Sequence, residues 1–252
     1  MKKVITLLTV AILLCGTALF SSCNDGEEPK VKGTVAMPVN AQYELSNLFD
    51  GKDNLFNVSI KTPANESYKI HSRQVVFTML GTYQFIHSDG SITNVEVKDE
   101  VSPSIYLNLM GYEPKLGEET SLPFLAVDNY DGDEITVRVT SSGAETNNRF
   151  TPLANGTDLV ISAMDKSNNV SEVKINLVSV GTTFTASNLI FGAQDVSDYA
   201  VSYKITECSQ EGNISYLGNS EKAQKGKYYI VTAMAKNGSS TLTATEYYIP
   251  ML

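Results

Sequence analysis

An acidic turn is the densest group of oxygen ligands in this sequence. It carries Asp128, Asp131, Asp133 and Glu134. Calcium takes six to eight oxygen ligands, mostly carboxylates and carbonyls, so this turn is a candidate calcium site, although its spacing is not that of an EF-hand loop. The alternative is a solvated turn whose aspartates accept hydrogen bonds from nearby backbone amides. Asp165 would be a further ligand only if the fold brings it close. The candidate ligands are Asp128, Asp131, Asp133 and Asp165, and no other cofactor is expected.

Tyrosines offer a second kind of chemistry, because sugars stack on ring faces and an exposed tyrosine keeps its hydroxyl in water. The chain has 13 tyrosines and no tryptophan. Adjacent residues of a strand point to opposite sides, so one of two neighbouring tyrosines faces outward unless another element covers it. The alternative is that each ring packs in a core or at a sheet edge. The candidate ligand-binding residues are Tyr112, Tyr130, Tyr228, Tyr229, Tyr247 and Tyr248.

Catalytic motifs are absent from the sequence. There is no His-Glu-x-x-His, no Gly-x-Ser-x-Gly, no phosphate-binding loop and no Cys-x-x-Cys. His71 and His87 fall between strands and in a hairpin, where we expect both to be solvated. We expect Cys208 to be a small packed hydrophobe. The sequence therefore predicts no catalytic residue and a protein that is not an enzyme.

The elements that would position these side chains read as β-strands. Apolar residues alternate with polar ones in segments such as 56–61, 135–140, 173–177 and 199–205. Such alternation places one set of side chains on a buried face and the other in water. Asp-Gly and Asn-Gly turns separate these segments. The pattern predicts an all-β chain of sandwiches or barrels.

A weak internal repeat divides the chain. Gly81, Gly156 and Gly226 each begin a strand that leads through a polar turn into a second strand. Each unit reads as a hairpin that closes a domain, and the spacing predicts three tandem β domains. Their expected ranges are 34–101, 102–180 and 181–252. The alternative is one larger sandwich whose hairpins look alike because hairpins generally do.

The middle unit carries a family resemblance. Its features are Pro103, Gly117, Leu122-Pro123, the acidic turn 127–133 and the hairpin that begins at Gly156. In these it resembles the Ig-like domain of bacterial surface proteins, which implies tandem Ig-like β-sandwiches. The first unit matches only at its final hairpin. The third departs further, since Ala235 stands where the middle unit has Asp165. Cadherin and fibronectin type III sandwiches are neighbouring alternatives.

The N-terminus carries a second resemblance. Lys2 and Lys3 precede an uncharged apolar run, and Ser21-Ser22 precede Cys23. This layout is that of a secretory signal peptide, and with the cysteine it resembles the lipobox of bacterial lipoproteins. It implies a signal peptide at 1–22 and a lipidated Cys23 at the head of an acidic tether, 23–33. Acidic residues after the cysteine resemble the export signal of Bacteroidetes surface lipoproteins. The resemblance implies an outer-membrane protein, anchored by its N-terminal lipid and facing the cell exterior.

Charge narrows the choice of partners. Removing residues 1–22 removes two lysines and no acid, so 17 basic residues face 28 acidic ones and the formal net charge is −11. Such an acidic chain is not expected to bind nucleic acid or anionic lipid surfaces, because both carry negative charge. The expected function is binding, with a glycan as the favoured ligand. The alternatives are an adhesion or fimbria-like component that engages a cell-surface protein through an exposed edge at Thr241–Ile249, and a spacer in a surface complex.

Overall fold

The computed structural model describes residues 31–47, 57–185, 197–209, 212–218 and 220–252. Within these ranges the elements are β-strands and one short 3-10 helix, η1 (Leu45–Asn47). The predicted all-β fold of tandem β-sandwiches is confirmed. The predicted signal peptide, Cys23 and most of the tether lie outside the described residues.

The first sandwich packs a five-stranded sheet against a strand pair. In spatial order the larger sheet consists of β1 (Val31–Pro38), β7 (Ile92–Lys98), β6 (Gly81–Ile86), β3 (Ser59–Lys61) and β4 (Ser67–Lys69). The facing pair consists of β2 (Gln42–Glu44) and β5 (Gln74–Val76). β1 pairs with β7 in parallel, whereas β6 pairs with β7 as an antiparallel hairpin.

Alternation along β6 and β7 builds the core of this sandwich. Tyr83 and Phe85 of β6 are buried, and so are Val95 and Val97 of β7. Their rings meet Phe77 edge-on, with centroids 5.0 Å from Tyr83 and 6.2 Å from Phe85. The alternation read from the sequence is thus the pattern that closes the two layers.

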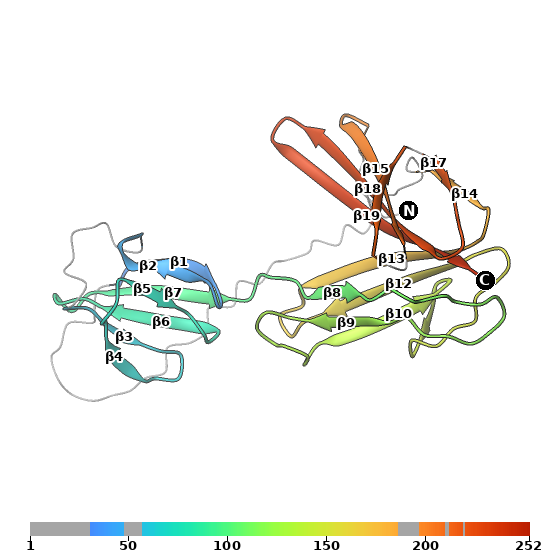
Figure 1. The fold of residues 1–252 in the computed structure, drawn as a ribbon. Coiled ribbons are helices and arrows are strands. Elements are labelled where there is room, and N and C mark those ends of the chain that lie inside the picture. Colours follow the sequence, from blue (N-terminus) through green and yellow to red (C-terminus); the bar gives the residue numbers. More distant parts are fainter. Residues whose placement is uncertain (1–30, 48–56, 186–196, 210–211, 219) are drawn as a thin grey trace, which may run out of the picture.

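The rest of the chain forms one curved eight-stranded sheet with two smaller sheets (Figure 1). In spatial order its strands are β11 (Ala144–Thr146), β10 (Thr136–Ser141), β12 (Thr157–Met164), β13 (Val170–Ser179), β19 (Ser240–Met251), β18 (Lys227–Asn237), β15 (Ala200–Ser209) and β16 (Ile214–Leu217). The smaller sheets are β8 (Ser104–Leu107) with β9 (Phe124–Val127), and β14 (Thr183–Thr185) with β17 (Ser220–Lys222).

Three hydrophobic clusters form the cores among the described residues. The first lies in the first sandwich, the second between β8–β9 and the β12–β13 part of the large sheet, and the third between β14–β17 and its β15–β18 part. We call the second and third of these layered units the second and third sandwiches. The predicted ranges stay predictions. The structure adds that the large sheet runs without a break from the second sandwich into the third.

Parallel pairing of β13 with β19 makes that sheet continuous. The register runs from Lys174 opposite Glu246 to Ser179 opposite Met251. β19 is also antiparallel to β18 over most of its length. Ile249 and Met251 of β19 belong to the second core, and Tyr248 belongs to the third. Residues 246–249 are therefore internal to the sheet, and the predicted free edge is covered there, whereas residues 241–245 pair with β18 alone among the described strands.

The three glycines of the predicted repeat occupy equivalent places. Gly81, Gly156 and Gly226 stand at or next to the start of β6, β12 and β18, and all three have positive φ, at 113°, 99° and 72°. The hairpins that follow are β6–β7, β12–β13 and β18–β19. At Gly156 an added Cβ would lie 3.3 Å from the carbonyl oxygen of Leu177. Backbone conformation explains the repeat, since glycine adopts positive φ without steric cost.

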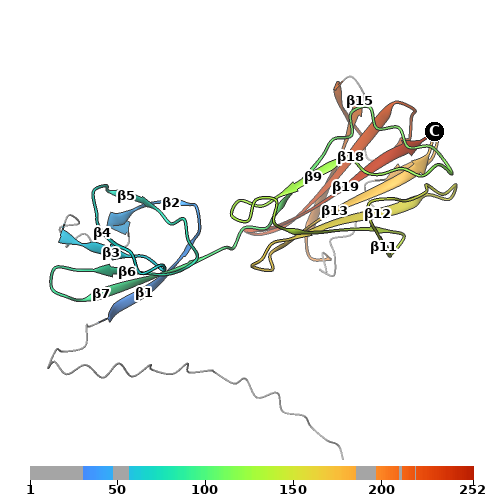
Figure 2. The ribbon, with the colours of Figure 1, turned by 90° about the horizontal axis from the view of Figure 1, so that it is seen from below.

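The first sandwich joins the second through a short connector, residues 99–103, between β7 and β8. Figures 1 and 2 show this connector as a single stretch of chain between the two bodies. Tyr130 of the second sandwich packs against the first core, and Asn40 Nδ2 donates to the carbonyl of Asn129 at 3.0 Å.

Candidate cation site and surface tyrosines

The acidic turn begins where β9 ends. The Asp128 amide donates to the carbonyl of Gly132 at 2.7 Å, which closes the turn. Asp128 Oδ1 accepts from the amides of Tyr130, at 2.7 Å, and Asp131, at 2.9 Å. Aspartate often bonds the backbone a few residues ahead in this way, so the turn is built on Asp128.

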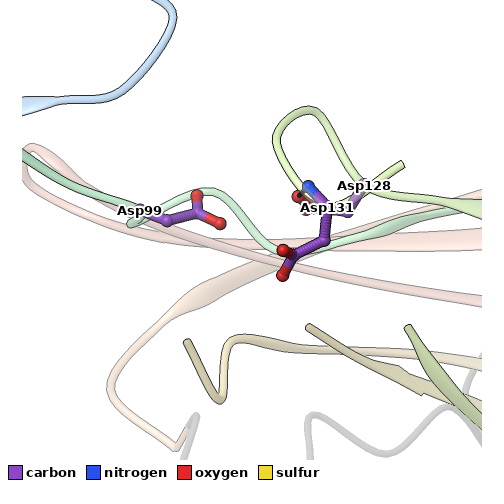
Figure 3. Close-up of side chains that lie close together, drawn as sticks. All are labelled: Asp99, Asp128 and Asp131. Carbon is purple, nitrogen blue, oxygen red and sulfur yellow. Dashed lines mark hydrogen bonds between the residues drawn. The ribbon is translucent and has the colours of Figure 1, made fainter. Parts of the chain in front are cut away.

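Asp99 joins this turn from the connector. Its Oδ1 accepts from the amide of Val101 at 3.2 Å. One carboxylate oxygen from each of Asp99, Asp128 and Asp131 lies within 4.8 Å of the others, and Figure 3 shows the carboxyl group of Asp99 turned toward that of Asp131. We call these three residues the junction triad. Two unit charges about 5 Å apart repel by about 3 kcal/mol at an effective dielectric constant of about 20.

Two oxygens of the junction triad have no hydrogen-bond partner. They are Oδ2 of Asp99 and Oδ2 of Asp128, and both residues are only 7% exposed. A buried polar atom is normally hydrogen-bonded, and burial of an unpaired charge is costly. Burial is accordingly the largest effect on the pKa of the Asp99 carboxyl group, and it raises that pKa. The Val101 amide opposes this rise, whereas the nearby charges of Asp128, Asp165 and Asp131 add to it.

Lys166 supplies positive charge at the outer side of the triad. Its amide donates to Asp131 Oδ2 at 2.8 Å, and its Nζ lies 3.7 Å from Asp131 Oδ1 and 2.5 Å from Glu134 Oε2. The Lys166 side chain is 59% exposed. The hydrogen bond to Glu134 is the largest effect on this lysine and raises its pKa. A single solvated ammonium leaves most of the triad's negative charge uncompensated.

Asp165 lies beside the triad but its carboxylate is already satisfied. Both its oxygens accept from Asn169, one from the amide and one from Nδ2, each at 2.8 Å. Asn169 Nδ2 also donates to the carbonyl of Asp99 at 3.1 Å. Asp165 therefore holds Asn169, which in turn holds the connector.

The predicted calcium ligands divide accordingly. Asp128 and Asp131 come together as expected, Asp165 is adjacent, and Asp133 is exposed and outside the cluster. Asp99 was missed. Its position after a strand and just before the predicted domain boundary at 101/102 was the signal that could have found it.

The predicted tyrosine platform is built largely into the cores. Tyr229 is fully buried and Tyr248 nearly so, and both rings contact Phe184, with centroids 4.9 and 4.7 Å away. Burial raises the pKa of Tyr229 to about 12. Tyr228 and Tyr247 pack against the second core, as does Tyr112, while Tyr130 packs against the first. Tyr229 and Tyr248 thus offer no stacking face to a sugar.

Other tyrosines are exposed instead. Tyr106 of β8 is 59% exposed and lies directly opposite Leu125 of β9, which is 58% exposed. Tyr216 of β16 is 69% exposed, with Lys204 Nζ 3.8 Å from its ring centroid. Tyr106 occupies an outward position of the alternating strand β8, whereas Ile214, Ser215 and Tyr216 of β16 are all exposed. Tyr68 of β4 is 46% exposed on the first sandwich.

The remaining titratable candidates have structural surroundings. Cys208 is a buried free cysteine, as predicted. His71 is exposed, as predicted. The expectation that His87 is solvated is wrong, because it is buried with Nε2 2.8 Å from Thr93 Oγ1. The hairpin turn that follows β6 folds this ring against β7.

No protein-family model matches this chain, and no curated protein matches it in sequence. Among solved structures it is similar to fibronectin(III)-like modules of CbhA from Clostridium thermocellum, with 14% identity and a TM-score of 0.27 over 58% of this chain and 88% of that chain. Tandem domains of titin match with 12% identity and a TM-score of 0.30 over 77% and 87%. Immunoglobulin domains of Sidekick-1 match with 10% identity and a TM-score of 0.27 over 87% and 57%. At these identities and TM-scores the similarity is distant and carries no argument.

The described ranges contain no helix with the length and apolar character needed to cross a bilayer.

Proposed function

We propose that this chain is a non-catalytic, lipid-anchored protein of the outer-membrane surface whose tandem β-sandwiches act by binding, with a glycan as the favoured ligand. The lipobox-like Cys23 and the acidic residues after it support the location. The net charge favours uncharged or cationic partners over nucleic acid.

The observation that carries the binding function is the exposed outer face of the β8–β9 pair. Tyr106 and Leu125 are cross-strand neighbours there, and both are more than half exposed. A tyrosine ring supported by an aliphatic neighbour offers a flat apolar surface with a polar tip, which suits the apolar face of a sugar. This surface replaces the platform expected from the sequence.

A glycan array tests this function. A chain that begins at residue 24 retains every described residue and is made without lipid. It is screened in calcium and in chelator. We expect specific binding that Tyr106→Ala abolishes and Tyr68→Ala, an exposed tyrosine of the first sandwich, leaves unchanged. Absence of any binding in both conditions contradicts glycan capture, and equal loss in both variants contradicts the β8–β9 face as its site.

Adhesion to a protein partner is the second candidate, and β16 favours it. This strand ends the eight-stranded sheet, pairs only with β15 among the described strands, and exposes Ile214 and Tyr216. An exposed apolar edge can accept a strand from another chain. Ile214→Pro would block such pairing, because the bond from the Ser209 amide to the Asn213 carbonyl and the β15–β16 register place the Ile214 N–H on the free edge. Loss of attachment of whole cells in I214P alone would favour adhesion over glycan capture.

The anchor is tested by Cys23→Ser in the full-length chain. We expect wild type in the membrane fraction and accessible to protease on intact cells, and the variant released. Retention of the variant in the membrane contradicts lipidation at Cys23.

A further inference from the structure

We infer that Asp99, Asp128 and Asp131 form a binding site for a hard divalent cation, with calcium as the expected ion, at the junction between the first and second sandwiches. The inference stands on the geometry of this junction and does not depend on which partner the protein binds.

The first argument is convergence from separate parts of the chain. Asp128 and Asp131 belong to one turn of the second sandwich, whereas Asp99 comes from the connector that leaves the first. Three carboxylates with oxygens within 4.8 Å of one another repel unless something of opposite charge lies between them. The fold brings them together all the same.

The second argument is the pair of unpartnered oxygens. Asp99 and Asp128 each use Oδ1 for backbone amides, and this fixes the orientation of both carboxylates. Each leaves Oδ2 buried and without a hydrogen-bond partner. Carboxylates positioned through one oxygen, with the other left free, are ready-made monodentate ligands. A bound cation would satisfy both atoms at once.

The third argument concerns the kind of ion. The donors are carboxylate oxygens alone, which suits hard cations rather than zinc or copper. Calcium tolerates irregular geometry and takes backbone carbonyls and water for its remaining positions, while magnesium demands near-octahedral placement. Ligands drawn from a turn and a connector fit the more tolerant ion. Lys166 approaches Asp131 from solvent and can move aside, since its side chain is 59% exposed.

Binding there would stiffen the joint. Without the ion, the contacts across or onto the connector that the described residues make include those of Asn40 with Asn129 and of Asn169 with Asp99, together with packing of Tyr130 on the first core. An ion held by Asp99 and by the turn ties the connector directly to the second sandwich. The orientation of the first sandwich then becomes calcium-dependent.

Calorimetric titration with calcium chloride tests the site. The chain from residue 24 is stripped with chelator, and magnesium chloride is titrated in parallel. We expect one calcium per chain with a Kd of about 10⁻⁴ to 10⁻³ M, the range of extracellular calcium modules, and weaker magnesium binding. Absence of binding at 10-fold higher calcium, or tighter binding of magnesium, overturns the inference.

Asparagine variants locate the site. Asp99→Asn and Asp128→Asn keep Oδ1 for the backbone amides, and each should weaken calcium binding by about tenfold or more. Asp133→Asn is the matched control, because it removes one charge from the same turn but lies outside the triad. Equal weakening in all three variants would indicate diffuse attraction by an acidic surface and would overturn the site.

Hydrogen exchange of backbone amides supplies a second measurement, which does not depend on the heat of calcium binding. The amides of Val101, Tyr130 and Asp131 donate to triad carboxylates, so calcium should slow their exchange in wild type and in Asp133→Asn. It should leave the amides of β18 unchanged. If Asp128→Asn fails to fold, Asp99→Asn carries the same test from the connector. Unchanged exchange at all three amides contradicts the proposal.

Discussion

The two junctions between the sandwiches of this molecule depend on different kinds of interaction. The first and second sandwiches meet at a short connector, a few polar contacts and three crowded carboxylates. The second and third share a sheet, joined by the β13–β19 ladder and by strands that contribute to both cores. Backbone hydrogen bonds and buried apolar surface change little with ions near neutral pH, whereas carboxylate clusters depend on them. One chain therefore contains a fixed joint and an adjustable one.

The largest effect should come from breaking the shared sheet. Ile249→Ala empties a fully buried site that β19 contributes to the second core, at an expected cost of about 2–5 kcal/mol. Because β19 also pairs with β18, we expect faster hydrogen exchange throughout the second and third sandwiches. Ile60→Ala, the same truncation in the first core, should destabilise the first sandwich alone. If Ile249→Ala speeds hydrogen exchange in the second sandwich only, the shared sheet does not couple the second and third sandwiches.

Alkaline pH should act on the fixed joint next. Burial raises the pKa of Tyr229 from 10.0 to about 12. A group whose folded pKa is raised contributes stability that is complete below its unfolded pKa, so this contribution should be lost between pH 10 and about 12. Tyr229→Phe should cost about 1 kcal/mol at pH 8, since the hydroxyl bonds Gln224 and Lys222, and should show less of the alkaline loss. Urea unfolding of wild type and Tyr229→Phe at pH 8 and pH 11 measures the cost of the substitution and the alkaline loss. Tyr216→Phe, at an exposed tyrosine, is the control.

A smaller effect is expected at the adjustable joint in chelator. Asp99→Asn removes one of three like charges and retains the acceptor for Val101, so it should raise the free energy of unfolding of the unit that contains the second sandwich by about 1 kcal/mol or less. In saturating calcium the sign should reverse, because wild type gains binding energy that the variant lacks. Thermal unfolding in chelator and in calcium gives both values. A variant that is less stable than wild type in chelator would contradict the like-charge interpretation.

The smallest effect is expected from Lys166. This exposed lysine pairs with Asp131 and Glu134, and exposed ion pairs contribute little to stability. Lys166→Gln should leave the melting temperature almost unchanged but tighten calcium binding a few-fold, since it removes a competing positive charge. Lys115→Gln, which removes an exposed pair with Glu118, is the matched control. Weaker calcium binding in Lys166→Gln would show that the lysine orients Asp131 rather than competing for it.

Local patterns in the sequence were reliable where the structure depends on local contacts. The alternating strands and the three glycine-led hairpins were predicted because each is fixed by residues close in sequence. Asp128 and Asp131 were predicted as partners for the same reason, since one turn holds both. Asp99 was missed because its contact with them crosses a junction that no local pattern encodes.

The tyrosines show most clearly where prediction from local sequence patterns fails. The reasoning that one of two adjacent tyrosines faces outward assumes a sheet covered on one side. Here Tyr247 packs on the second core and Tyr248 on the third, because the shared sheet is covered on both sides at this point. The parallel pairing of β13 with β19 causes this, and that pairing joins segments far apart in the chain. Exposed Tyr106 and Tyr216 lack a sequence signal that distinguishes them.

The place of β19 in the sheet also sets the order of events in folding. β13 reaches its full pairing only after the chain has passed through β15, β16 and β18, so the second core stays open on that side until the third sandwich assembles. Contacts between distant segments slow folding, and an unpaired β13 is an exposed edge in the meantime. We therefore expect the second and third sandwiches to fold in one slow cooperative step, while the first, whose strands all lie within residues 31–98, folds earlier and independently.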